Sequence, residues 1–170
     1  MAPRITPAPL AETEPGRAAE AQILASRGSI SQLYRLLLHS PPVAMGWESL
    51  LTAIRTKTGL APALREMVIL RIAVLNDAPY EFAAHTPFAL DAGLTASRIQ
   101  ALQSDARDQF DTKECCVLDY CDVMTRHVHV PDELFARVRE YFDDTAMVEL
   151  TATIAAYNMV SRFLEAMHVR

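Results

Sequence analysis

Two glutamates and a histidine near the middle of the chain could carry acid–base chemistry. Glu81 and His85 are four residues apart on a predicted helix, so their side chains share one face. Glu66 lies in a segment otherwise too apolar to face solvent, and burial beside apolar side chains favours the neutral form of a carboxyl group. An imidazole close to such a carboxyl can share a proton with it near neutral pH. Glu66, Glu81 and His85 are therefore candidate catalytic residues.

Four neighbouring or aromatic residues are candidates for binding a substrate. Tyr80 adds a phenol beside this group of residues. Arg65 and Arg71 could neutralise a substrate carboxylate, because a guanidinium group can bind a carboxylate through two parallel hydrogen bonds. Trp47, on an earlier predicted helix, is the fourth candidate. These residues would suit a small substrate that carries a carboxylate.

Structural interpretations of the same residues compete with the catalytic one. A Glu and a His four residues apart can form a solvated surface pair, which would apply to Glu81 and His85. A buried glutamate can belong to a structural ion pair, and for Glu66 the partner would be Arg71. Residue spacing alone leaves these alternatives open.

Composition argues against several other classes of function. The net charge of −5 disfavours a general affinity for nucleic acid, and five glycines form no phosphate-binding loop. The pair His127 and His129 lacks further ligands at metal-binding spacing, so we predict no metal site. The three cysteines are an odd number without disulfide-framework spacing. No apolar run is long enough to span a bilayer and no signal-peptide pattern opens the chain, so we expect a cytoplasmic protein.

Apolar residues recur at helical spacing along most of the chain, and no strand pattern interrupts them. Pro41 and Pro42 suit the first turn of the helix that carries Trp47. Residues 61–75 are apolar nearly all round, which predicts a helix buried on most faces. Pro79 begins the next helix, in which Pro87 predicts a kink or a restart. Further helices are expected at 95–103, 113–126, from Pro131, and at 145–168. The fold class is therefore all-α.

The first residues of the chain differ from the rest in composition. Residues 1–20 are rich in Pro, Ala and Glu and show no apolar period, so we predict an extended N-terminal arm that packs on the body or on a neighbouring subunit. Residues 21–170 are predicted to form a single helical domain of a size that can bury a core.

Three stretches of the sequence resemble one known superfamily. The segment LREMVILRIAVLNDAPYEFAAHTPFALDAGLT, the C-terminal FDDTAMVELTATIAAYNMVSRFLEAMHV and the arm RITPAPL resemble the carboxymuconolactone decarboxylase and alkylhydroperoxidase-D superfamily. The resemblance implies an AhpD-like helical bundle without a sheet. Glu66 and His85 match the glutamate and histidine of the peroxidase branch, but Ala78 and Glu81 stand where that branch has its Cys-x-x-Cys pair. Peroxide reduction needs thiols. We therefore expect a decarboxylase-like member without thiol-dependent peroxidase activity.

The resemblance also implies a reaction and an assembly. The expected activity is that of a cofactor-free lyase of aromatic-compound catabolism, which decarboxylates a small unsaturated carboxylate or lactone by proton transfer. Isomerisation or hydration would use the same groups. Glu81 or His85 would deliver the proton, Glu66 would orient His85, and an arginine would hold a carboxylate. Self-association as a homotrimer or hexamer is expected. The alternative is a stress-linked or non-catalytic oligomeric protein on the same scaffold, because a fold alone does not fix a function.

Overall fold

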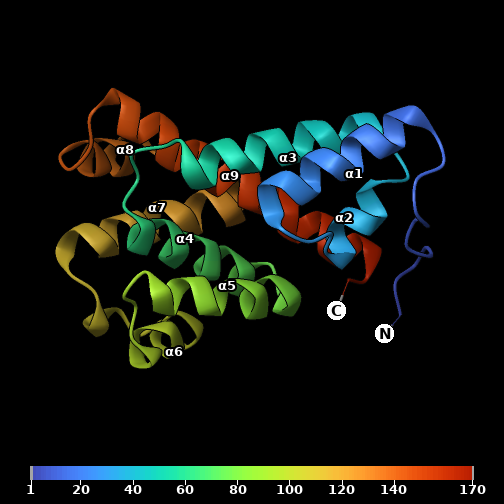
Figure 1. The fold of residues 1–170 in the computed structure, drawn as a ribbon. Helices are drawn as coiled ribbons and strands as arrows, with labels where there is room; N and C mark the ends of the chain where they lie inside the picture. The colour runs from blue at the N-terminus through green and yellow to red at the C-terminus, as the bar shows by residue number, and fades with distance from the viewer. Residues whose placement is uncertain (1, 170) are drawn as a thin grey trace. The chain divides into compact units, whose positions relative to one another are not determined.

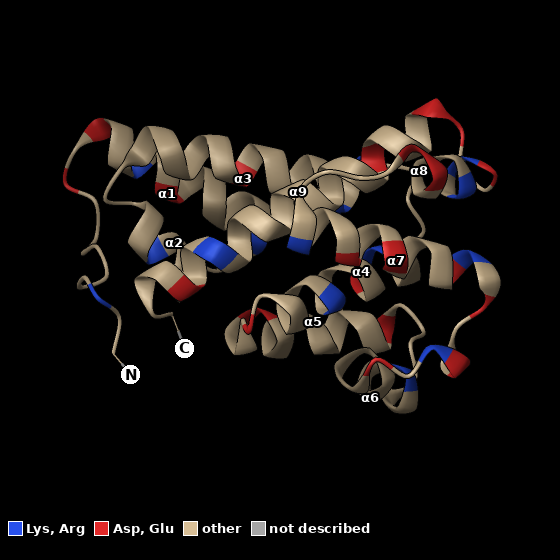
Figure 2. Ribbon diagram, turned by 180° about the vertical axis from the view of Figure 1, so that it is seen from behind, with Lys and Arg blue, Asp and Glu red and all other residues tan. Residues whose placement is uncertain are grey.

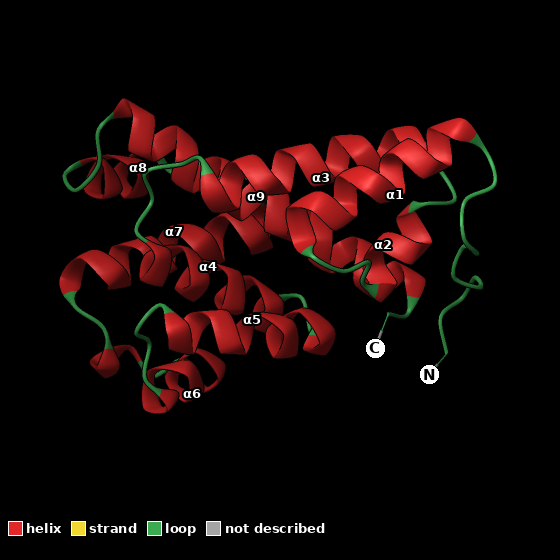
Figure 3. Cartoon of the chain, in the orientation of Figure 1, coloured by secondary structure: helices red, strands yellow, loops and turns green. Residues whose placement is uncertain are grey.

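The computed structural model describes residues 2–169, and this part of the chain contains helices and no strand (Figures 1 and 3). The all-α prediction is confirmed. The helices are α1 (Glu14–Arg27), α2 (Gln32–Leu37), α3 (Pro41–Thr56), α4 (Pro62–Leu75), α5 (Pro79–Asp91), α6 (Ala96–Ser104), the 3-10 helix η1 (Arg107–Gln109), α7 (Thr112–His127), α8 (Asp132–Arg139) and α9 (Asp144–Met167).

The chain divides into two compact units. One contains the chain up to Thr58 and from Ala166 onward, and the other spans Gly59–Glu165. The single domain predicted for residues 21–170 stays a prediction. Glu66, Glu81 and His85 all belong to the second unit, whereas Trp47 belongs to the first.

The extended N-terminal arm is shorter than predicted, because α1 already begins at Glu14. Pro15 lies in the first turn of this helix, where its missing N–H removes no helical hydrogen bond, and the alanines that follow favour a helix. The residues before α1 pack within their own unit. The main-chain N–H of Ala8 donates to the carbonyl of Arg35 (2.9 Å), and the main-chain N–H of Arg4 donates to that of Met167 (3.0 Å).

Helices α4 and α5 form an antiparallel pair that positions the candidate catalytic residues. The main-chain N–H of Ala78 donates to the carbonyl of Ala73 (2.8 Å) and closes the turn between them. The ring of His85 contacts the carboxylate of Glu66. In each of these two contacts, one residue precedes the turn by as many positions as the other follows it. This symmetry is expected when one helix returns alongside the other. The two helices lie side by side in Figure 1.

Helix α5 continues through Pro87 without the predicted restart. A proline removes the hydrogen bond to the carbonyl four residues earlier, which here belongs to Ala83. Both Pro87 and Ala83 are exposed, so water can satisfy that carbonyl. The missing bond therefore falls on the solvent face of the helix, and the buried face keeps Glu81 and His85 in one continuous helix.

Asparagine side chains tie α9 to the other helices of the second unit. The side-chain amide of Asn76, just after α4, donates to the Asn158 side-chain oxygen at 3.0 Å. The amide of Asn158 in turn donates to the Thr125 hydroxyl on α7 at 2.9 Å. Because Asn158 is buried, losing either contact would leave a polar group unsatisfied. These bonds fix the register of α9 against α4 and α7.

Charged residues are distributed over both units. In Figure 2, basic and acidic residues are interspersed, and within the described residues no helix is basic along its whole length. Likewise, none of the helices in residues 2–169 is long and apolar enough to cross a bilayer.

Candidate active site

The predicted contact between Glu66 and His85 is confirmed. Nδ1 of His85 lies 2.7 Å from Oε2 of Glu66, and both side chains are buried. The hydrogen bond is possible because α5 returns along α4 and places these two residues at the same level. A carboxylate bound to Nδ1 fixes the tautomer of the imidazole and stabilises its protonated form.

The structure corrects the protonation state that we predicted for Glu66. Burial by itself raises the pKa of this carboxyl, but the hydrogen bond and charge of His85 and then the charge of Arg65 outweigh it. The net pKa lies below the usual value, so Glu66 is ionised at neutral pH. Nε of Arg65 lies 3.3 Å from Oε1 of Glu66. The partners of Glu66 are therefore His85 and Arg65, and not Arg71 as in the competing structural interpretation.

Glu81 has a different environment on the same helix. Its side chain is only 2 % exposed, and its Oε2 lies 2.5 Å from the hydroxyl of Ser161 on α9. Burial raises the pKa of Glu81 to about 8, against a smaller lowering effect of the Ser161 hydrogen bond. Glu81 is therefore a neutral acid near pH 7, one helical turn from His85 on the same face of α5.

Two residues on α9 complete the arrangement, and our sequence analysis missed both. The ring of Tyr157 meets the ring of His85 edge to face, with centroids 5.2 Å apart and planes at 87°. Ser161 contacts Glu81 and also the main-chain carbonyl of Tyr157, at 2.9 Å. Their polar groups recur four residues apart within the apolar stripe of α9, which was the available signal. The sequence did not indicate which helix they face.

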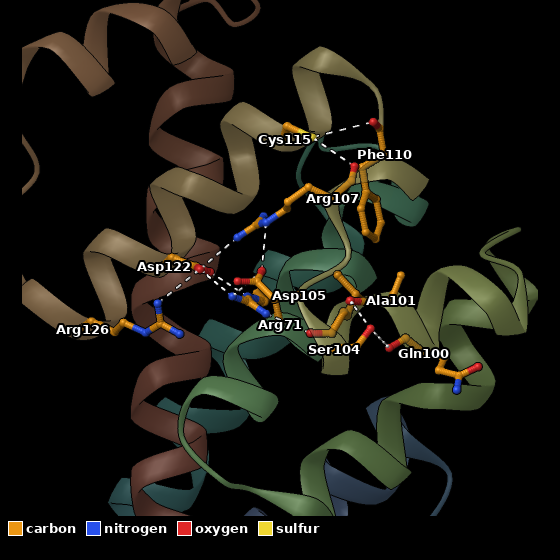
Figure 4. A network of polar contacts seen from close by, with 11 residues as sticks. Arg71, Gln100, Ala101, Ser104, Asp105, Arg107, Phe110, Cys115, Asp122 and Arg126 are labelled. Atoms are coloured by element: carbon orange, nitrogen blue, oxygen red, sulfur yellow. Dashed lines mark hydrogen bonds and ion pairs between the residues drawn. The ribbon is translucent and has the colours of Figure 1, made fainter.

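The two arginines proposed for substrate binding lie on different faces of α4. Five positions on an α-helix correspond to a rotation of roughly 140° between Glu66 and Arg71. Arg71 is buried and binds Asp122 on α7 through two hydrogen bonds, of 2.7 and 2.5 Å (Figure 4). It also contacts Asp105 and the carbonyl of Leu102. Arg71 is therefore engaged in a structural ion pair away from Glu66, which contradicts its predicted role, whereas Arg65 lies beside Glu66.

Tyr80 and Trp47 remain predicted substrate-binding residues. Tyr80 is half-buried in the first turn of α5, just before Glu81. Trp47 is buried on α3 in the first unit. Each keeps its predicted role as a proposal.

The environments of Cys115 and Cys121 disfavour thiolate chemistry. Burial raises the pKa of Cys121 to about 12, and burial also raises the pKa of Cys115. All three cysteines are free thiols. Within residues 2–169, no three His, Cys, Asp or Glu side chains are grouped so that they could hold a metal ion.

Comparison with known proteins identifies the family of this chain. A model of the carboxymuconolactone decarboxylase family matches residues 41–113, which include Glu66, Glu81 and His85. The uncharacterized protein YdfG of Bacillus subtilis (strain 168) is 31 % identical over 106 residues, which cover 61 % of this chain and 72 % of that protein. The chain belongs to the carboxymuconolactone decarboxylase family.

Solved structures with little sequence identity share the fold of this family member. The debrominase Bmp8, crystallised as a variant in complex with 2,3,4-tribromopyrrole, gives a TM-score of 0.81 at 16 % identity over 100 % of this chain and 92 % of that one. The alkylhydroperoxidase AhpD core from Ralstonia eutropha JMP134, a peroxidase-related protein, gives 0.81 at 19 % identity over 99 % and 93 %. The predicted AhpD-like fold is confirmed.

Proposed function

We propose that this family member is an enzyme that transfers protons on a small unsaturated carboxylate or lactone, with decarboxylation as its reaction. The buried hydrogen bond between Glu66 and His85 is the observation that carries the proposal. An ionised carboxylate on one nitrogen of an imidazole is the arrangement expected of an orienting residue and its acid–base partner. Family membership supports the reaction class.

His85 and Glu66 have different roles in the proposed reaction. When the carbon–carbon bond to the departing carboxylate breaks, carbon dioxide leaves and the bonding electrons pass into the unsaturated lactone. The substrate itself is thus the electron sink. The imidazolium form of His85 then donates a proton from Nε2 to the substrate carbon, and solvent returns a proton to the imidazole. Glu66 stays ionised throughout and stabilises the imidazolium.

Arg65 supplies the positive charge that a carboxylated substrate needs. A guanidinium group has five N–H donors, of which Glu66 takes one. With Glu66 ionised and Glu81 neutral, the site carries no excess negative charge that would repel an anion. The debrominase of the same fold was crystallised with a small planar heterocycle, which supports a substrate of that size.

A spectrophotometric screen against unsaturated carboxy-lactones tests the proposal, because loss of conjugation changes their absorbance. We expect the wild type to consume one of them and His85→Gln to lose roughly 100-fold or more of the turnover, since glutamine cannot carry a proton. His127→Gln is the matched control, because His127 is exposed at the end of α7. Undiminished turnover by His85→Gln would overturn the mechanism. A screen without any turnover would favour the non-catalytic alternative.

A further inference from the structure

The hydroxyl of Ser161 lies between two oxygen atoms in the interior of the second unit. Its Oγ is 2.5 Å from Oε2 of Glu81 and 2.9 Å from the main-chain oxygen of Tyr157, and Ser161 is fully buried. Two oxygens approach this closely when a hydrogen lies between them. A serine hydroxyl has a single hydrogen, so Ser161 can be the donor in only one of the two contacts.

A protonated Glu81 can supply the other hydrogen, whereas a main-chain carbonyl has none to give. With Glu81 protonated on Oε2, its O–H donates to Ser161 and the Ser161 hydroxyl donates to Tyr157. Both contacts are then hydrogen bonds. An ionised Glu81 would leave one buried pair of oxygens without a hydrogen, which is costly away from water. The contacts are therefore those of a carboxylic acid whose proton is held on Oε2.

The second oxygen of Glu81 is then a carbonyl-type acceptor. Oε1 is buried and accepts no hydrogen bond from the residues that the structure describes. A ligand that brings an N–H or O–H group to a buried acceptor of this kind removes the free-energy cost of the missing hydrogen bond. Because Glu81 precedes His85 by one helical turn on the same face of α5, a donor bound at Oε1 would lie beside the imidazole.

We infer that Ser161 is a positioning residue that orients the protonated carboxyl of Glu81, and that Oε1 of Glu81 accepts a hydrogen bond from a hydroxyl or ring N–H of the substrate. The inference rests on the proposed function for the site at which the substrate binds. It narrows the substrate class to small unsaturated acids that carry such a donor. It also assigns Glu81 to recognition, in place of the proton delivery expected for it from the sequence.

Glutamine and methionine at position 81 separate recognition from proton transfer. In Glu81→Gln the amide N–H donates to Ser161 and the amide oxygen replaces Oε1, so we expect this variant to keep more of the wild-type kcat/KM than Glu81→Met does. Glu81→Met fills a similar volume without polar atoms and should lose roughly tenfold or more in kcat/KM. If Glu81→Gln loses as much activity as Glu81→Met, Glu81 transfers a proton and the inference is wrong.

A pair of probe ligands tests the donor directly, without turnover. Pyrrole-2-carboxylate and furan-2-carboxylate have similar size and charge, but only the pyrrole ring carries an N–H. We expect calorimetric titration to show roughly tenfold tighter binding of the pyrrole acid by the wild type and by Glu81→Gln, and no preference in Glu81→Met. Equal affinities in the wild type would overturn the donor assignment. Failure of both rings to bind would count against the proposed function and its substrate class.

Infrared difference spectra, wild type minus Glu81→Gln, test the protonation state even if no ligand binds. We expect a band of a buried carboxylic acid near neutral pH. In Ser161→Ala that band should persist at a higher frequency, because the acid O–H loses its acceptor, while circular dichroism shows an intact helical fold. A carboxylate band in the wild type, or a band unchanged by Ser161→Ala, would contradict the role given to Ser161.

Discussion

Glu66 and Glu81 are both buried carboxyls, yet their surroundings stabilise opposite protonation states. Glu66 faces His85 and Arg65, whose positive charges favour the carboxylate. Glu81 faces the hydroxyl of Ser161, which compensates only part of the desolvation. Pairs of carboxyl groups whose pKa values are shifted in opposite directions are typical of sites that transfer protons. Each state leads to its own prediction at the residue scale.

Replacing Glu66 by glutamine should lower turnover and change its pH dependence. A neutral amide on Nδ1 stabilises the imidazolium of His85 less than a carboxylate does, so less of the proton-donating form is present at any given pH. We expect the alkaline limb of the pH–rate profile to move to lower pH and the turnover at neutral pH to fall roughly tenfold or more. Glu140→Gln is the matched control, because Glu140 is exposed. An unchanged profile in Glu66→Gln would contradict the orienting role.

The raised pKa of Glu81 predicts a pH-dependent stability difference from Glu81→Gln. In the unfolded chain Glu81 ionises near its usual pKa of 4.5, whereas in the folded protein it keeps its proton up to about pH 8. Its contribution to stability is therefore complete below 4.5 and is lost as the pH rises toward 8. Glutamine does not titrate, so the free energy of unfolding of the variant should rise by a few kcal/mol relative to that of the wild type across this pH range.

Urea unfolding of the wild type and Glu81→Gln at several pH values measures this gain. Glu66 on α4 and His85 on α5, the neighbouring ionisable groups, titrate in both proteins, so their effects largely cancel in the difference. A constant difference between the two proteins would show that Glu81 ionises normally in the folded state.

At the scale of the helices, α4 carries the candidate catalytic residues and a structural ion pair on different faces. Glu66 and Arg65 lie at the face toward α5 and His85. Arg71 lies on another face, where it joins α4 to α7 through Asp122 (Figure 4). One helix thus carries both the candidate catalytic carboxylate and a buried ion pair that fixes its packing.

Arg71→Met should therefore destabilise the fold without weakening substrate binding. Removing one partner of a buried ion pair leaves a charge without compensation, and we expect a loss of about 3 kcal/mol. Arg126→Met is the control, because Arg126 is half exposed and lies 3.6 Å from the same Asp122. That change should cost about 0.5 kcal/mol or less. Urea unfolding measures both. A normal stability of Arg71→Met with weaker binding of pyrrole-2-carboxylate would restore Arg71 to the site.

At the scale of the whole molecule, we expect a trimer or larger assembly in solution, as the family resemblance implies. Exposed apolar side chains on the second unit support this expectation, because such patches mark interaction surfaces. Val148 on α9 is 68 % exposed, and it lines an apolar groove of about 380 Å³ together with Phe135 of α8. Sedimentation velocity at micromolar concentration measures the assembly. A monomer under these conditions would contradict the prediction.

The sequence by itself determined the local features of this protein. Helical periodicity and proline positions indicated α4 and α5, and the short turn between these helices brings Glu66 level with His85. The start of α1 was missed, since a composition rich in Pro and Glu obscured a helix that Pro15 can begin. Local patterns are sufficient where both partners lie on consecutive helices joined by a short turn.

The tertiary structure decided which groups surround each ionisable side chain. Ser161, which contacts Glu81, is 80 residues away in the chain, and Asp122, which binds Arg71, is 51 residues away. Helical periodicity tells which residues share a face, but it does not tell which remote helix that face will meet. Protonation depends on the partners within a few ångströms, because the desolvation of a carboxyl is offset only by hydrogen bonds and charges at that range. The neutral state of Glu81 and the ionised state of Glu66 therefore followed from the packing of α9 and α5 and not from the sequence around either residue.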